Sequence, residues 1–141
     1  MTPPVRREVL VKASPARAFE LFTGRIGDWW PLAEYSVYGD GTVAFEGSQL
    51  VERKGSDESV WGAVTAWNPP DEVAFTWHPG YDEAQATDVR VTFTAEGDET
   101  LVTLVHTGWE RMTDPDAAAD EYRNGWPGVL AGFAALVERE A

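Results

Sequence analysis

The sequence predicts an α+β fold in which a curved antiparallel sheet of about six to seven strands surrounds one long C-terminal helix. Strand-like segments separated by turn sequences occupy residues 42–107, and a further one precedes them near the N-terminus. After Asp114-Pro115 the apolar residues change to helical spacing. A helix with one apolar stripe must cover a sheet, and consecutive hairpins form a sheet that must bury one face.

The N-terminal part predicts one strand and two short helices. Residues 5–12 are rich in Val and alternate loosely, which is typical of a strand. Ser14 and Pro15 then begin a helix, because Ser is a good N-cap and Pro fits the first turn. Gly24 ends that helix, and residues 25–30 are expected to form a second short helix that stops at Pro31.

The middle of the chain is rich in strand signals. The expected strands are 42–46, 49–54, 60–67, 72–78, 87–95 and 101–107. Turn sequences at 47–48, 54–57, 68–71 and 96–99 separate most of them. Alternation in the last strand places Val102, Leu104 and His106 on one face.

The C-terminal segment carries a single apolar stripe. Its members are Tyr122, Trp126, Val129, Leu130, Phe133, Leu136 and Val137. Pro127 lies within this pattern and is expected to kink the helix or restart it, since proline cannot donate the helical hydrogen bond.

Composition narrows the functional classes. A length of 141 residues suits one domain spanning residues 1–141. The absence of cysteine excludes disulfides and thiolate nucleophiles, and a net charge of −13 disfavours nucleic acid. That charge indicates either solubility or an acidic face for a basic partner protein. With no signal-like or membrane-length apolar run, we expect a cytoplasmic protein that does not associate with membranes.

Five segments in order resemble a known family. They are residues 13–19, 22–31, 61–77, 102–109 (VTLVHTGW) and 125–130 (GWPGVL). Together they resemble the START/birch-allergen-like superfamily, also called SRPBCC, and within it the bacterial branch related to the activator of the heat-shock protein 90 ATPase. The resemblance covers nearly the whole chain. It implies a helix-grip fold whose internal cavity commonly holds an apolar or amphipathic small molecule.

Aromatic residues are the most informative candidates for a binding site. Seven Trp, six Phe and four Tyr exceed the needs of a small core, so some are expected to line a cavity, although most could simply be core. The predicted ligand-binding residues are Phe75, Trp77, Phe93, His106, Trp109, Trp126 and Phe133. Glu52 and Arg53 are adjacent on one strand, so only one can face inward, and that one is the expected polar anchor.

His106 is the single candidate for acid–base chemistry. His106 shares a strand face with Val102 and Leu104, so its side chain is expected to point toward the interior. There it is either a core histidine with its hydrogen bonds satisfied, or a ligand donor or general base. His78 falls at a strand end and is expected to have no role. Two histidines and no cysteine predict no metal site, and no cofactor is expected. No Gly-x-Ser-x-Gly elbow occurs, which disfavours a serine hydrolase.

Three functional hypotheses follow. The first is a protein that binds a small hydrophobic ligand in the cavity. The second is a cyclase, aromatase or dehydratase that acts on a polyketide-like substrate in the same cavity, with His106 as the acid–base group. The third is a co-chaperone-like interaction module, for which a chaperone or a second copy of the chain is the candidate protein partner.

Overall fold

The computed structural model describes residues 2–31, 38–39, 41–79 and 81–140. In these residues it contains a seven-stranded antiparallel sheet, two short helices after the first strand and a long C-terminal helix, which confirms the predicted class. The elements are β1 (Val5–Val11), α1 (Pro15–Gly24), α2 (Ile26–Trp29), β2 (Thr42–Glu46), β3 (Gln49–Lys54), β4 (Asp57–Asn68), β5 (Glu72–Trp77), η1 (Glu83–Gln85), β6 (Thr87–Glu96), β7 (Glu99–Thr107), η2 (Trp109–Arg111) and α3 (Pro115–Arg139).

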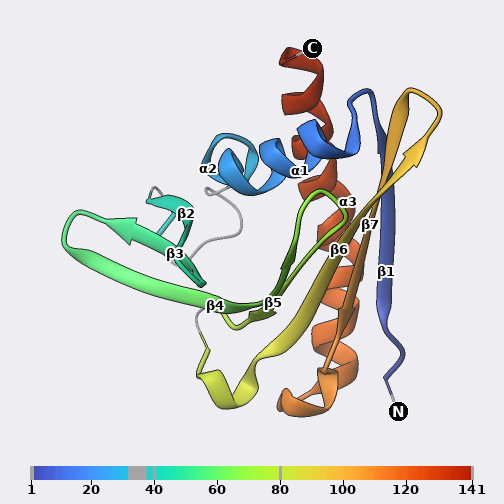
Figure 1. Cartoon of the computed structure of the whole chain (residues 1–141). Helices are drawn as coiled ribbons and strands as arrows, with labels where there is room; N and C mark the ends of the chain where they lie inside the picture. Colours follow the sequence, from blue (N-terminus) through green and yellow to red (C-terminus); the bar gives the residue numbers. More distant parts are fainter. Residues whose placement is uncertain (1, 32–37, 40, 80, 141) are drawn as a thin grey trace.

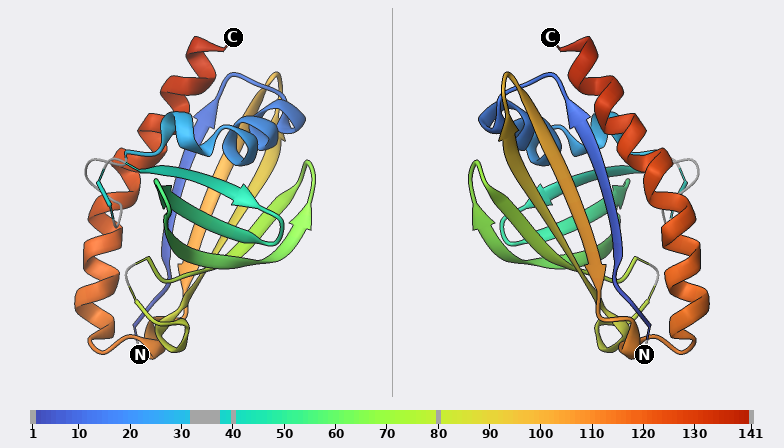
Figure 2. Two further views of the ribbon diagram at one scale, coloured as in Figure 1. Left: turned by 90° about the vertical axis from the view of Figure 1, so that its left-hand side faces the viewer. Right: turned by 90° about the vertical axis from the view of Figure 1, so that its right-hand side faces the viewer.

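The sheet has the order β1-β7-β6-β5-β4-β3-β2. Successive strands pair as antiparallel neighbours from β2 to β7, and β1 closes the other edge by pairing with β7. The sheet curves, α3 runs along it beside β1, and α1 and α2 cross one end (Figures 1 and 2). This arrangement places the inward faces of β5, β6 and β7 opposite the apolar stripe of α3.

Both main helices begin where the sequence predicts, after Ser14 and at Asp114-Pro115. Ser14 Oγ accepts a hydrogen bond from the Arg17 backbone N–H at 3.2 Å, directly before α1. Asp114 accepts one from the Ala117 backbone N–H at 3.3 Å, directly before α3. In each helix a proline occupies the first turn, where a missing N–H costs nothing.

The long helix continues through Pro127 without restarting. Proline has no N–H, so the carbonyl of Arg123, four residues earlier, loses its helical donor. The guanidinium of Arg7 on β1 supplies the replacement: its Nε and Nη2 donate to the Arg123 carbonyl oxygen at 3.3 and 3.0 Å. A hydrogen bond from the sheet therefore replaces the helical hydrogen bond that the Arg123 carbonyl loses at Pro127.

Other departures from the predicted elements are small. β4 begins at Asp57 instead of residue 60, because Asp57–Glu58 still pair with the end of β3. Two short 3₁₀ turns, η1 and η2, were not predicted, since three-residue elements carry no periodic signal.

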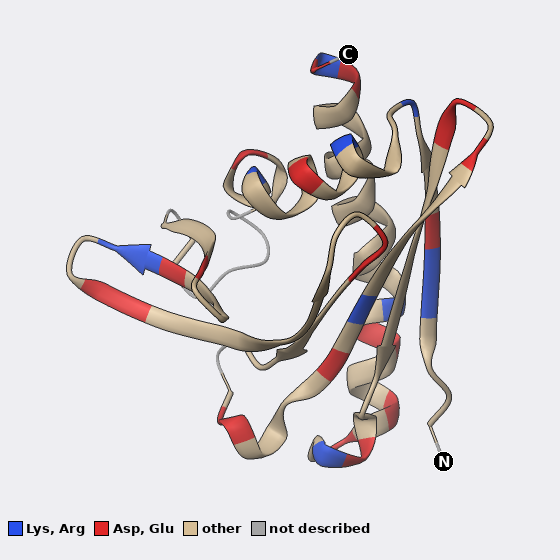
Figure 3. Ribbon diagram, viewed as in Figure 1, with Lys and Arg blue, Asp and Glu red and all other residues tan. Residues whose placement is uncertain are grey.

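The core lies between the sheet and α3. Six residues of the predicted stripe are at most 3 % exposed, and Tyr122 is half-buried. Charged residues lie mainly outside this core, and the acidic ones are spread over strands, turns and α3 instead of gathering on one face (Figure 3). Within the described residues, no helix is long and apolar enough to cross a membrane.

Candidate functional site

His106 lies at the centre of a buried polar network. It is 0 % exposed on β7, and its Nε2 lies 2.6 Å from Thr87 Oγ1 on β6. Trp126 on α3 donates its indole N–H to His106 Nδ1 at 3.0 Å. Since an indole nitrogen can only donate, Nδ1 must be the unprotonated acceptor and Nε2 must carry the proton. The Thr87 oxygen accepts a hydrogen bond from this N–H, and the Thr87 hydroxyl donates to the Trp77 carbonyl oxygen at 3.2 Å.

This environment keeps the imidazole neutral. Burial lowers the pKa of His106 to about 3, because desolvation disfavours the charged ring. Both ring nitrogens already have partners, so the histidine is satisfied as a structural residue. It could accept a proton only if Trp126 released Nδ1.

Tyr122 extends the network to β5. Its hydroxyl accepts a hydrogen bond from Trp77 Nε1 at 3.0 Å, and its ring centroid lies 4.8 Å from that of His106. Burial raises the pKa of Tyr122 to about 12. The phenol therefore keeps its proton at neutral pH and can act as a donor beside His106.

Trp109 contributes a buried donor without an acceptor. Its ring lies over His106 with a centroid separation of 4.1 Å, and the residue is only 2 % exposed. No hydrogen-bond partner for its Nε1 exists in the described part of the chain. Buried N–H groups are nearly always satisfied, so this one marks a position where an acceptor is needed.

The structure gathers some of the predicted ligand-binding residues and separates others. Trp77, His106, Trp109 and Trp126 form one cluster, and Phe75 adjoins it through Trp77, with ring centroids 5.9 Å apart. Phe93 and Phe133 are equally buried, but they pack around Phe22 of α1 at centroid distances of 5.7 and 5.2 Å.

Two members of the network were not predicted as site residues. Thr87 precedes Val89 in the alternating pattern of β6, so its inward direction was readable from the sequence. Tyr122 belonged to the helical stripe. Their hydrogen bonds to β5 and β7 depend on the tertiary structure and had no sequence signal.

The choice between Glu52 and Arg53 is settled by the sheet. Glu52 faces inward and is 0 % exposed, where it accepts hydrogen bonds from Trp61 Nε1 and the Tyr38 backbone N–H, both at 3.3 Å. Arg53 faces outward and forms ion pairs with Glu46 and Glu58 at 2.5 and 2.6 Å. Glu52 is thus the inward-facing polar residue of β3.

The remaining titratable candidates lie elsewhere. His78 follows β5, and its Nδ1 lies 3.1 Å from the Tyr81 carbonyl oxygen. It is 8 % exposed and does not join the His106 network. No group of three or more histidine, aspartate or glutamate side chains suited to a metal ion occurs within residues 2–31, 38–39, 41–79 and 81–140.

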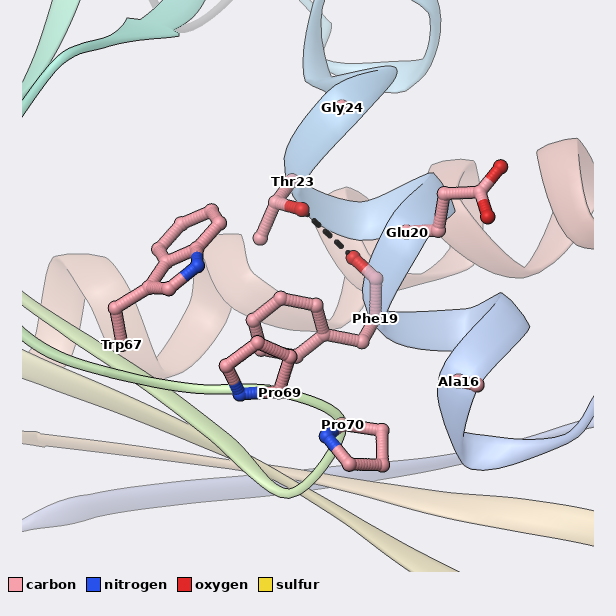
Figure 4. Close-up of a pocket in the computed structure, with 8 residues that line it drawn as sticks. All are labelled: Ala16, Phe19, Glu20, Thr23, Gly24, Trp67, Pro69 and Pro70. Carbon is pink, nitrogen blue, oxygen red and sulfur yellow. Dashed lines mark hydrogen bonds between the residues drawn. The ribbon is translucent and has the colours of Figure 1, made fainter.

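A surface groove lies between α1 and the β4–β5 turn (Figure 4). Its volume is about 430 Å³, and it is lined by Ala16, Phe19, Glu20, Thr23, Gly24, Trp67, Pro69 and Pro70. The groove is separate from the His106 network, since none of its residues belongs to that network.

The curved sheet and long helix define a helix-grip protein with an aromatic interior. The chain belongs to the family of Activator of Hsp90 ATPase homolog 1-like proteins, whose sequence pattern matches residues 12–138. This confirms the resemblance found in the sequence. Comparison with curated proteins gives no match.

Solved structures of similar fold include three informative relatives. The anthrahydroquino-gamma-pyrone synthase Txn09, complexed with SUM, is 34% identical over 94% of this chain and 96% of its own, with a TM-score of 0.65. The self-sacrificing resistance protein CalC from Micromonospora echinospora is 25% identical over 99% and 96%, with a TM-score of 0.68. The Aha1 dimer from Colwellia psychrerythraea is 19% identical over 97% of both chains, with a TM-score of 0.71.

Proposed function

We propose that the protein binds an uncharged apolar or amphipathic small molecule in the aromatic interior between the sheet and α3. The observation that carries this proposal is the buried Trp109 indole N–H, which has no acceptor among the described residues. A ligand oxygen beside Trp109 would satisfy it. The neighbouring His106 and Tyr122 are both neutral at neutral pH, so the surroundings favour a ligand without charge.

The similarity to Txn09 supports the choice of ligand class. That protein is named as a synthase of an anthrahydroquinone fused to a γ-pyrone, which is a flat polycyclic aromatic bearing oxygens. The alignment covers nearly all of both chains. A flat oxygenated aromatic fits rings such as Trp77, Trp109 and Trp126, because aromatic faces bury large apolar area and orient the guest.

The test compares native and denaturing mass spectrometry of the freshly purified protein, before and after incubation with a panel of flat oxygenated aromatics. We expect a small-molecule mass that is present in the native spectrum and lost on denaturation. Trp109→Phe should weaken binding because it removes the indole N–H, whereas Leu10→Ser, at an exposed position on β1, should leave it unchanged. Absence of any complex with the whole panel would contradict the proposal.

A second candidate is a cyclase- or dehydratase-type enzyme that uses the same interior. The name of Txn09 as a synthase favours it. In this case Tyr122 would donate a proton or hydrogen bond to a substrate oxygen, and His106 would exchange a proton only after Trp126 released Nδ1. Turnover of a bound polyketide-like substrate that is lost in Tyr122→Phe while binding persists would support this function.

A co-chaperone-like role is the third candidate, and the family description favours it. The acidic surface would then meet a basic region of the chaperone. Binding of the purified chaperone, measured at low and high salt, tests this candidate directly. If no binding is detected at low salt, the co-chaperone candidate is excluded, because electrostatic attraction is strongest at low salt.

A further inference from the structure

Trp67 differs from every other tryptophan of the chain. It is 47 % exposed, whereas the other six are at most 7 % exposed. An exposed aromatic ring indicates a binding surface when it is contiguous with other apolar residues in a groove. The exposed ring forms one wall of the groove between α1 and the β4–β5 turn (Figure 4).

The walls of this groove are anchored in the core. Phe19 meets Trp67 edge to face, with ring centroids 5.2 Å apart at 80°. The same Phe19 ring packs on Phe93 at 5.3 Å inside the protein, and Phe45 supports Trp67 from another side at 6.0 Å. The groove is open beside Gly24, where an added Cβ would meet no atom within 4 Å.

Two polar side chains, Thr23 and Glu20, line the groove with Trp67, and each already has a hydrogen-bond partner. Thr23 donates its hydroxyl to the Phe19 carbonyl at 2.8 Å and turns its methyl group toward Trp67 (Figure 4). Glu20 directs its carboxylate away from Trp67, and this carboxylate pairs with Arg17 at 2.7 Å. The Trp67 indole N–H has no hydrogen-bond partner among the residues that the structure describes. The edge of the indole ring that carries this N–H is turned toward α1 (Figure 4).

We propose that this groove is a second ligand site, which binds a flat, uncharged aromatic molecule through its rings and one acceptor oxygen, as in an aromatic ketone. The ring system would lie against Trp67 and Phe19, and the oxygen would accept the Trp67 N–H. A volume of about 430 Å³ lies in the range of small-molecule pockets. The nearby Glu20 and the net charge of −13 disfavour an anion. This site is independent of the interior site proposed above.

Indole N–H signals in ¹⁵N-correlated NMR spectra test the proposal, since each of the seven tryptophans gives one signal. The probes are 1-indanone and indane, which share a shape and differ in the carbonyl. We expect 1-indanone to move the Trp67 signal saturably and to leave the other six in place, and indane to bind about tenfold more weakly. Trp67→Phe should reduce the affinity for 1-indanone to that for indane.

A variant that adds a side chain at a residue lining the groove provides the second measurement. Gly24→Leu should weaken 1-indanone binding about tenfold or more, because Gly24 lines the groove. The fold should be kept, since a Cβ at this position meets no atom within 4 Å. Leu10→Ser is the control for an exposed apolar position outside the groove.

Several outcomes would overturn the site. These are an unmoved Trp67 signal, equal binding of indane, or undiminished binding to Gly24→Leu. A Trp67 signal that moves on dilution of the protein alone would identify a second copy of the chain as the occupant instead. The Trp109 and Trp126 signals report the interior, so failure of this site and failure of the interior site are separately visible.

Discussion

The indole N–H of Trp126 on α3 points at Nδ1 of His106 on β7, 3.0 Å away. This contact determines the chemistry of the histidine, because it occupies the nitrogen that would otherwise accept a proton. It also joins the long helix to the sheet through a polar contact inside an apolar core. A buried hydrogen bond of this kind specifies one arrangement of helix on sheet.

The first prediction concerns stability against acid. His106 has a pKa of about 3 in the folded protein and ionises near 6.5 in the unfolded chain. The unfolded state therefore binds a proton first, and the free energy of unfolding should fall as pH drops from about 6.5 toward 3. We expect a loss on the order of 4 kcal/mol over that range. Urea unfolding at several pH values measures it.

The control for this prediction is His106→Gln. Glutamine can accept from Trp126 and donate to Thr87 but does not titrate, so the variant should show a shallower pH dependence. Ring NMR of the wild-type protein should show the neutral Nε2–H tautomer down to about pH 4. Titration of the ring near pH 6 would refute the assignment.

The second prediction tests the hydrogen bond between His106 Nε2–H and the Thr87 hydroxyl oxygen. Thr87→Val keeps the shape of the side chain but removes the hydroxyl, which leaves His106 Nε2–H unsatisfied. We expect a loss of about 1–3 kcal/mol in the free energy of unfolding. Thr87→Ser retains the hydroxyl and should lose clearly less. Equal stability of the two variants would show that the hydroxyl is dispensable.

The third prediction concerns Tyr122. Its pKa of about 12 means that it ionises after an unfolded tyrosine, whose pKa is about 10. Stability contributed by the neutral phenol is therefore present below pH 10 and is lost as pH rises toward 12. A near-ultraviolet absorbance titration should show a tyrosine that ionises late and is missing in Tyr122→Phe.

Tyr122→Phe also removes the acceptor of Trp77 Nε1, so it should destabilise the protein by about 1–3 kcal/mol at pH 7. A variant as stable as the wild type at pH 7 would argue that water replaces the phenol oxygen.

The fourth prediction compares two glycines. A Cβ at Gly62 on β4 would lie 1.7 Å from the Thr76 carbonyl oxygen on β5, so Gly62→Ala must push the strands apart. We expect a loss of more than about 3 kcal/mol or failure to fold. Gly24→Ala meets no atom within 4 Å and should be neutral or stabilising by up to about 1 kcal/mol. Thermal unfolding of both variants measures the difference, and similar melting temperatures would contradict it.

Much of the fold was readable because its signals are local. The N-cap Ser14 marked the start of α1 and the pair Asp114-Pro115 marked the start of α3. The periods of residues 87–95 and 122–137 identified a strand and a helix. The behaviour at Pro127 was not readable. The group that satisfies the Arg123 carbonyl comes from Arg7, which lies 116 residues away in the sequence.

The candidate site was also predictable only in part from the sequence. The alternation of β7 alone predicted that His106 faces inward. Successive side chains of a strand point to opposite faces, so His106 shares the buried face of Val102 and Leu104. The adjacency of Glu52 and Arg53 showed that one of them faces inward, but the pairing of β3 with its neighbours decided that it is Glu52. The sequence by itself thus determined the family, the order of the main helices and strands, and the inward phase of β7. Only the tertiary structure decided the neutral state of His106, the unsatisfied Trp109 and the exposure of Trp67, because these depend on contacts between residues far apart in the chain.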